Sequence, residues 1–198
     1  MPAEMTRKLI ATPSQTVGPF FHIGLDRPGW ADLTAGDPQG ERIVIEGRVT
    51  DGDGAPVPDA CLELWQANAV GRYAHPDDTR TDKPLDPHFR GFGRVSTDAE
   101  GNFRVTTIRP GPVPGRGNAL QAPHIAVALF ARGLLKQLYT RIYFAGDPLN
   151  DTDPVLLRID DAARRQTLLA QSPNGSEPAT WHLDIVMQGD NETVFFDI

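Results

Sequence analysis

The sequence predicts a mainly β protein, a β-sandwich of mixed sheets with an extended N-terminal arm and one or two short helices. Short segments alternate between apolar and polar side chains, which is the pattern of half-buried strands. The 19 glycines and 18 prolines are spread along the chain, as turns between short strands require. Only one stretch, late in the chain, has the pattern of a helix. Many short strands, frequent turns and one late helix are typical of a β-sandwich.

Residues 1–40 lack a sustained period and contain many breakers, so we interpret them as an arm and covering loops. Residues 41–198 then form the sandwich, and we expect the 198 residues to make a single domain. The expected strands cover residues 42–51, 60–68, 93–97, 102–108, 124–131, 138–144, 181–188 and 193–198.

Two local patterns predict how some of these elements are joined. The turn DAEG between 93–97 and 102–108 favours a hairpin. The segment 153–171 predicts a helix, with Asp153 as its N-cap and Pro154 at its first helical position.

Composition excludes several function classes. A net charge of −7 argues against nucleic acid as a partner, and an anionic substrate would require a local basic group. No apolar run approaches the length of a membrane span, so we expect no membrane partner. The N-terminus lacks the apolar stretch of a signal peptide, which favours a cytoplasmic location. The single cysteine, Cys61, excludes an internal disulfide and is expected to be buried.

Short motifs carry little chemistry when each is taken alone. DGDG at 51–54 lacks the later ligands of a calcium loop and favours a hairpin turn. None of the five histidines forms H-x-H, H-x-x-H or HExxH with another. His124 shares a strand face with Ala126, Ala128 and Phe130 and, alone, is a structural histidine. Tyr73, alone, is a packed aromatic residue.

Several long stretches together resemble the intradiol ring-cleaving dioxygenases. They are DGAPVPDACLELWQANAVGRY (53–73), GRVSTDAEGNFRVTTIRPGP (93–112), APHIAVALFARG (122–133) and DIVMQGDNETVFFDI (184–198). TPSQTVGPFFHIGL (12–25) is similar to the N-terminal arm of the alpha chains in the family's two-chain members. The resemblance covers nearly the whole chain, with the motifs in the family's order.

The resemblance also implies where iron would be held. Iron-bearing chains of the family hold Fe(III) with two tyrosines, in G-R-Y and after P-G-P, and with the two histidines of H-I-H. The matching positions here are Tyr73, Val113, His124 and Ala126, so two of the four donors are absent. Ferric iron is a hard ion that anionic phenolate oxygen stabilises. We therefore expect no iron in this chain, with Tyr73 and His124 as vestigial positions and the Fe(III) on a partner beta chain.

In the two-chain members, the substrate pocket lies where the alpha and beta chains meet. The resemblance implies this pairing, with protocatechuate and O2 as substrates and 3-carboxy-cis,cis-muconate as product. No catalytic residue is expected in this chain alone. The pocket wall is expected to include Thr16, Gly18, Pro19 and Arg132. Glycine allows a close backbone approach to a flat ring, and arginine supplies a fixed positive charge for an anionic substrate.

Alternatives remain at this point. Arg132 alone is a solvated charge at a strand end, and Gly18-Pro19 alone is a turn. A homo-oligomer that binds iron by itself would require tyrosine and histidine at positions 113 and 126, which the sequence lacks. A transthyretin-like structural or binding sandwich without an enzymatic role would need neither iron nor Arg132.

Overall fold

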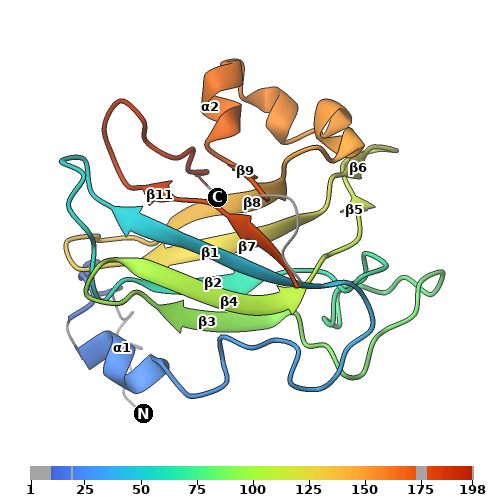
Figure 1. The fold of residues 1–198 in the computed structure, drawn as a ribbon, viewed down its shortest axis with the longest axis horizontal. Coiled ribbons are helices and arrows are strands. Elements are labelled where there is room, and N and C mark those ends of the chain that lie inside the picture. The colour runs from blue at the N-terminus through green and yellow to red at the C-terminus, as the bar shows by residue number, and fades with distance from the viewer. Residues whose placement is uncertain (1–9, 19, 173–177, 198) are drawn as a thin grey trace, which may run out of the picture.

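The computed structural model describes residues 10–18, 20–172 and 178–197, and it shows two β-sheets packed face to face (Figure 1). One sheet has the strand order β3-β2-β7-β8-β9, and the other places β1 between β4 and the pair β10 and β11. The strands of the first sheet are β2 (Cys61–Trp65), β3 (Phe92–Ser96), β7 (His124–Phe130), β8 (Leu138–Phe144) and β9 (Leu169–Ala170). Those of the second are β1 (Arg42–Thr50), β4 (Asn102–Ile108), β10 (Ala179–His182) and β11 (Ile185–Val186).

Smaller elements cover the ends of the sandwich. A two-stranded ribbon pairs β5 (Val113–Pro114) with β6 (Leu120–Gln121). The helical elements are α1 (Phe20–Leu25), α2 (Ala162–Gln166) and the 3-10 turns η1 (Pro148–Thr152) and η2 (Leu156–Arg158). The α1 helix and the β5–β6 ribbon lie at opposite ends of the molecule (Figure 1). The predicted fold class, a mainly β sandwich with an arm and short helices, is confirmed.

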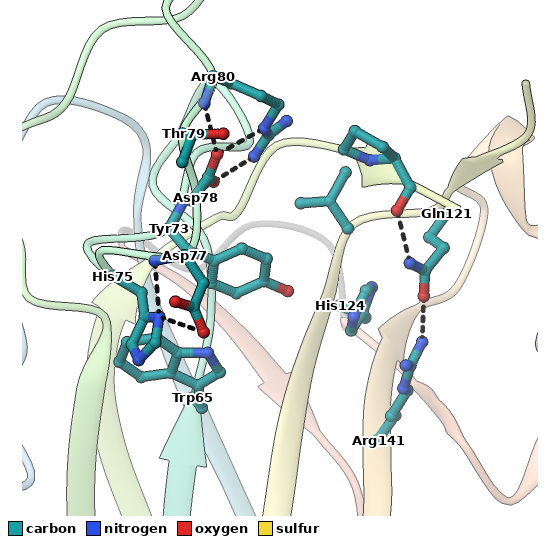
Figure 2. Close-up of a pocket in the computed structure, with 12 residues that line it drawn as sticks. Trp65, Tyr73, His75, Asp77, Asp78, Thr79, Arg80, Gln121, His124 and Arg141 are labelled. Carbon is teal, nitrogen blue, oxygen red and sulfur yellow. Dashed lines mark hydrogen bonds and ion pairs between the residues drawn. The ribbon is translucent and has the colours of Figure 1, made fainter. Parts of the chain in front are cut away.

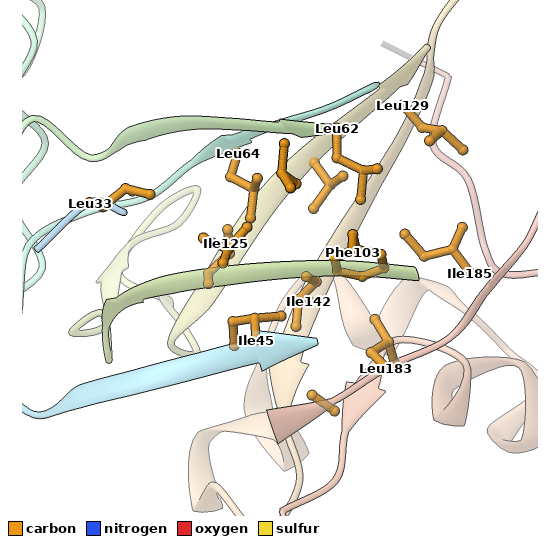
Figure 3. Close-up of a cluster of buried hydrophobic side chains, with 14 of the residues drawn as sticks. Leu33, Ile45, Leu62, Leu64, Phe103, Ile125, Leu129, Ile142, Leu183 and Ile185 are labelled. Carbon is orange, nitrogen blue, oxygen red and sulfur yellow. The ribbon is translucent and has the colours of Figure 1, made fainter. Parts of the chain in front are cut away.

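The core lies between the two sheets, and strand alternation explains it. On β7, Ile125 and Leu129 are fully buried, whereas Ala126 and Ala128 on the opposite face are half-buried. Side chains from both sheets meet in one apolar cluster (Figure 3). Removing this apolar surface from water is the main force that holds the sheets together.

The predicted hairpin between 93–97 and 102–108 is wrong. β3 pairs with β2 and β4 pairs with β1, so the DAEG turn crosses from one sheet to the other. The Thr97 hydroxyl fixes this crossing: it donates to the Val57 carbonyl at 2.7 Å and accepts from the Ala60 amide at 2.9 Å. The same four-residue turn fits a hairpin and a crossing, so the turn sequence alone does not decide.

The predicted helix over 153–171 is also wrong, because the segment divides into η2, α2 and β9. Asp153 does accept hydrogen bonds from the amides of Val155 and Leu156, as an N-cap would. Asp161 caps a second start by accepting from the Ala163 amide. Leu169 and Ala170 then join β8 as an edge strand, so sheet pairing overrides the helical pattern.

The C-terminal strands also differ from expectation. The segment 181–188 lies in two short strands in one register with β1: the Leu183 amide bonds to the Glu46 carbonyl, and the Arg48 amide then donates to the Asp184 carboxylate before β11 begins. Gly47 permits this approach, since a Cβ there would lie 1.8 Å from the Leu183 oxygen. Within the described part of 193–198, the only pairing is an isolated bridge between Tyr139 and Phe196.

Three smaller expectations can be compared with the structure. DGDG forms a turn, with the Asp51 carboxylate accepting from the amides of Asp53 and Ala55. Cys61 is buried, and burial raises the pKa of its thiol to about 11. No helix in the described ranges is long and apolar enough to cross a membrane.

Candidate functional site

Three of the four positions that the resemblance matches to iron ligands lie together. Tyr73, Val113 and His124 line a cavity of about 610 Å³ at the end of the sandwich that carries the β5–β6 ribbon (Figure 2). Ala126 lies two residues along the same face of β7 but lines a neighbouring cavity of about 590 Å³. Gln121 and Arg141 line both cavities, so they form the wall between them.

His124 is held by a chain of contacts that begins at Asp153. The Asp153 carboxylate, fully buried, accepts a 2.7 Å hydrogen bond from the Ala122 amide. The Ala122 carbonyl in turn lies 2.7 Å from His124 Nδ1. Because a carbonyl only accepts, Nδ1 carries the proton and Nε2 keeps its lone pair. Burial lowers the pKa of His124 to about 4, with the Arg141 cation as a second cause, so the ring is neutral at pH 7.

Tyr73 belongs to an aromatic wall on the opposite side of the cavity. Its ring stacks on Trp65 with centroids 5.7 Å apart, and its hydroxyl points across the cavity toward His124 (Figure 2). The loop that carries Tyr73 is tied by Asp78, which accepts from the Tyr73 amide and pairs with Arg80. Burial raises the pKa of the Tyr73 phenol, so the hydroxyl is neutral at pH 7.

Arg141 brings a positive charge to the same site. On β8 it lies directly opposite Ala126 of β7, and its Nη1 donates to Gln121 Oε1 at 2.7 Å and to the Tyr143 hydroxyl at 3.1 Å. No carboxylate of the described residues lies within ion-pair distance of this guanidinium. Its link to a carboxylate is indirect, because the Tyr143 hydroxyl that it contacts donates in turn to the buried Asp153 at 3.4 Å.

The side chains of this cavity do not fit a ferric ion. One phenol and one imidazole remain, and Val113 and Ala126 offer no donor atom where the family's second tyrosine and second histidine would stand. Among the described residues, no group of three or more His, Cys, Asp or Glu side chains is placed to hold a metal. Two neutral donors do not define a closed coordination geometry for this hard, highly charged ion.

The residues expected to line a partner's pocket lie at the other end of β7. Thr16 Oγ1 accepts a 2.7 Å hydrogen bond from the Gly133 amide and lies 3.5 Å from the Ala131 carbonyl, so it spans the turn that carries Arg132. Arg132 is 55% exposed and pairs with Asp59 at 3.3 Å. The Gly18 carbonyl accepts from the Phe21 amide at the start of α1. Pro19 lies outside the described residues.

An aromatic contact also holds α1 against this end of β7. The Phe21 ring lies 5.4 Å from the Phe130 ring, which fixes α1 against the last residue of β7. The structure therefore brings Thr16 and the Arg132 turn together. It also separates them from His124 by nearly the full length of the strand, roughly 25 Å at about 3.3 Å per residue.

Comparison with known proteins decides the family. Residues 18–189 match the model of the dioxygenase family, and the chain is 39% identical over its full length to the whole protocatechuate 3,4-dioxygenase alpha chain of Pseudomonas putida. The chain belongs to the intradiol dioxygenase family. It is also 44% identical to the protocatechuate 3,4-dioxygenase beta chain of Burkholderia cepacia, over 91% of this chain and 77% of that one.

Solved structures of intradiol dioxygenases agree with the fold. The dioxygenase domain of a carbohydrate-binding fusion protein from Streptomyces sp. SirexAA-E matches with a TM-score of 0.60 and 27% identity, covering 91% of this chain and 99% of that one. Catechol 1,2-dioxygenase from Pseudomonas arvilla C-1 matches with a TM-score of 0.58 and 25% identity, covering 80% and 55%. Members of this family use Fe(III), and the interpretation as a sandwich without an enzymatic role is not favoured.

Sequence reasoning missed the residues that surround the vestigial pair. Trp65, Gln121, Arg141 and Asp153 belong to no motif that predicts a site, although Asp153 was noted as a helix cap. The alternation of β8 places Arg141 on the same face as Tyr143. The alternation indicates that Arg141 belongs to the site only when the pairing of β8 with β7 is known.

Proposed function

We propose that this chain is the alpha subunit of a protocatechuate 3,4-dioxygenase. In this proposal, an iron-bearing beta chain cleaves protocatechuate with O2 to 3-carboxy-cis,cis-muconate, and this chain completes the substrate pocket. The observation that carries the proposal is a cavity that holds one phenol and one imidazole, whereas the positions matched to the other two ligands are Val113 in its wall and Ala126 in the neighbouring cavity. A family member that cannot complete an iron shell needs the iron of another chain.

Identity alone does not separate the two kinds of chain, since the alpha and beta relatives are 39% and 44% identical to this one. The absent donors favour the alpha assignment, because an iron-bearing chain requires all four. Coverage points the same way: the match spans all of the Pseudomonas putida alpha chain and 77% of the Burkholderia cepacia beta chain.

The residues that would contact the partner's pocket lie at the end of β7, around the turn that carries Arg132. We assign pocket contacts to Thr16, Gly18, Pro19 and Arg132, with the guanidinium offsetting the negative charge of the substrate. The 55% exposure of Arg132 supports this role, because its guanidinium, although paired with Asp59, is open to a neighbouring chain. The chain acts as one domain, and the unpaired Cys61 thiol suits the reducing cytoplasm, where we place the assembly.

Co-expression tests the proposal directly. The partner is a beta chain that carries G-R-Y, P-G-P-Y and P-A-H-I-H. The two chains should co-purify, and the complex should consume protocatechuate and O2 in equal amounts. Each chain alone, at the same concentration, is the control. Equal activity of the beta chain with and without this chain would overturn the proposal.

A further inference from the structure

The cavity around Tyr73 and His124 has the size of a small-molecule site, although it lacks the four ligand side chains that iron requires. Its volume of about 610 Å³ lies within the range of roughly 300–1,000 Å³ that such sites occupy. One wall carries the stacked rings of Trp65 and Tyr73, and beside them lie Asp77, which pairs with His75, and Asp78, which pairs with Arg80. The opposite wall carries His124, Gln121 and Arg141 (Figure 2).

His124 offers an unused acceptor inside this cavity. The side chain is only 5% exposed, and its Nδ1 proton is donated to the Ala122 carbonyl. No described residue gives Nε2 a hydrogen bond. Nε2 is not one of the enclosed side-chain atoms left without a partner, so it is reachable from the cavity and can accept a hydrogen bond from a donor inside it.

Arg141 offers unused donors beside it. Its Nη1 is engaged by Gln121 and Tyr143, which fixes the guanidinium, while Nε and Nη2 have no partner among the described residues. An arginine held this way and without a paired carboxylate suits a carboxylate ligand, which its fork can bind with two hydrogen bonds.

The spacing of the two groups defines the ligand further. His124 lies opposite Tyr143 and Ala126 opposite Arg141, so His124 and Arg141 are diagonal neighbours on one face of the sheet. The backbones of diagonal residues lie about 7–8 Å apart, and both side chains extend from there into the cavity, so a benzene ring with substituents at two separated carbons can contact both. The ring would then lie between the sheet and the aromatic wall of Trp65 and Tyr73.

From this geometry we infer that the cavity binds a small hydroxybenzoate without a metal. The hydroxyl of the ligand donates to His124 Nε2, and its carboxylate accepts from Arg141. This site is separate from the partner's iron pocket proposed above, because Thr16 and Arg132 lie at the other end of β7. The ligand is bound and not transformed, since the cavity supplies no oxidant.

The experiment measures how many molecules of 4-hydroxybenzoate bind to the co-purified complex. This probe lacks the second hydroxyl needed for ring cleavage. Equilibrium dialysis with labelled ligand gives the total bound per αβ pair, and the visible absorption of the iron gives occupancy of the iron site. The difference is the occupancy of this cavity. We expect about one ligand per copy of this chain beyond those at the iron. No excess over the iron-site count would overturn the inference.

Variants locate the extra site. His124→Phe and Arg141→Met should each weaken the extra binding by at least about tenfold while leaving iron-site binding unchanged. His182→Phe and Arg104→Met are matched controls outside the cavity and should bind as the wild type does. Excess binding that survives both cavity variants would place the ligand elsewhere and contradict the assignment.

A ligand series on the unaltered complex keeps the inference falsifiable if the variants do not assemble. Benzoate lacks the hydroxyl that His124 accepts, and phenol lacks the carboxylate that Arg141 binds. Each should fill the extra site roughly tenfold more weakly than 4-hydroxybenzoate. Equal affinity for all three would show that neither polar contact is made. Because this count does not use turnover, an inactive complex would refute the proposed function without refuting this site.

Discussion

Thr16 Oγ1 accepts a 2.7 Å hydrogen bond from the Gly133 amide, although 117 positions separate the two residues. This contact ties the N-terminal arm to the turn that carries Arg132. The same hydroxyl also lies 3.5 Å from the Ala131 carbonyl, to which it can donate. The arm is therefore hydrogen-bonded to the sandwich at the end of β7. It holds the backbone from which the proposed pocket arginine projects.

Replacing Thr16 tests whether this contact positions Arg132. Thr16→Val removes the acceptor and keeps the shape, so the turn loses a hydrogen bond worth about 1 kcal/mol. We expect kcat/KM of the complex for protocatechuate to fall roughly fivefold, mainly through KM. Thr16→Ser keeps the hydroxyl and should restore nearly full activity. Equal kinetics for the Val and Ser variants would show that the contact has no role in the pocket.

Arg132 itself should have a larger effect. Losing a charge-assisted contact to an anionic substrate costs on the order of 1.5–3 kcal/mol, which is roughly ten- to a hundredfold in kcat/KM. We expect Arg132→Ala to lower kcat/KM by that factor while assembly and iron content stay intact. Arg104→Ala, on a different sheet, is the matched control. An assembled, iron-replete Arg132→Ala complex with wild-type kinetics would identify Arg132 as a surface charge only.

The buried His124 predicts a pH dependence of stability. Burial lowers its pKa to about 4, whereas a histidine in the unfolded chain titrates near 6.5. As the pH falls below about 6.5, the unfolded state takes up a proton that the folded state does not, so stability decreases until about pH 4. Between about pH 7.5 and pH 5, this loss should be about 2 kcal/mol.

Urea unfolding of the co-purified complex, with the wild-type chain or with His124→Phe, at several pH values measures this difference. The variant lacks the titrating group, so its stability should change less over the same interval. His182→Phe, which replaces a half-exposed histidine outside the cavity, is the matched control. Parallel pH curves for the wild type and His124→Phe would contradict the assignment of a buried neutral imidazole.

The arm also predicts dependence on a partner. Ile10 is 92% exposed and Ile23 is 66% exposed, so the arm presents apolar side chains that the described part of the chain leaves uncovered. Obligate interfaces commonly bury roughly 2,000–5,000 Å². Expressed alone, the chain should aggregate in size-exclusion chromatography, and co-expression with the beta chain should give a single complex. A monodisperse monomer that ignores the beta chain would count against this prediction.

Much of the fold followed from local patterns. The strands at 102–108 and 138–144 have the predicted bounds, because their alternation is long and their turns are clear. Pairing did not follow: the hairpin and the long helix failed where Thr97 and Ala170 made contacts with segments distant in sequence. Such contacts have no local signature, since they depend on which strands become neighbours.

Some residues of the candidate site were likewise predictable from the sequence, and others were not. Motif resemblance located Tyr73, Val113 and His124, which the structure brings into one cavity. It did not indicate Arg141, which lies in the wall between two cavities only because β8 pairs with β7 in this register. It also gave no sign that Asp153 holds His124 through Ala122, a relation that depends on backbone contacts between distant segments.

The central claim is that this chain belongs to an iron enzyme without holding iron itself, and elemental analysis tests it most directly. Iron is measured in the chain purified alone, refolded from aggregates if necessary in the presence of ferric iron, and in the co-purified complex. We expect far less than one iron per chain for the chain alone and one iron per αβ pair for the complex. Stoichiometric ferric iron with a phenolate-to-metal absorption band in this chain alone would contradict it.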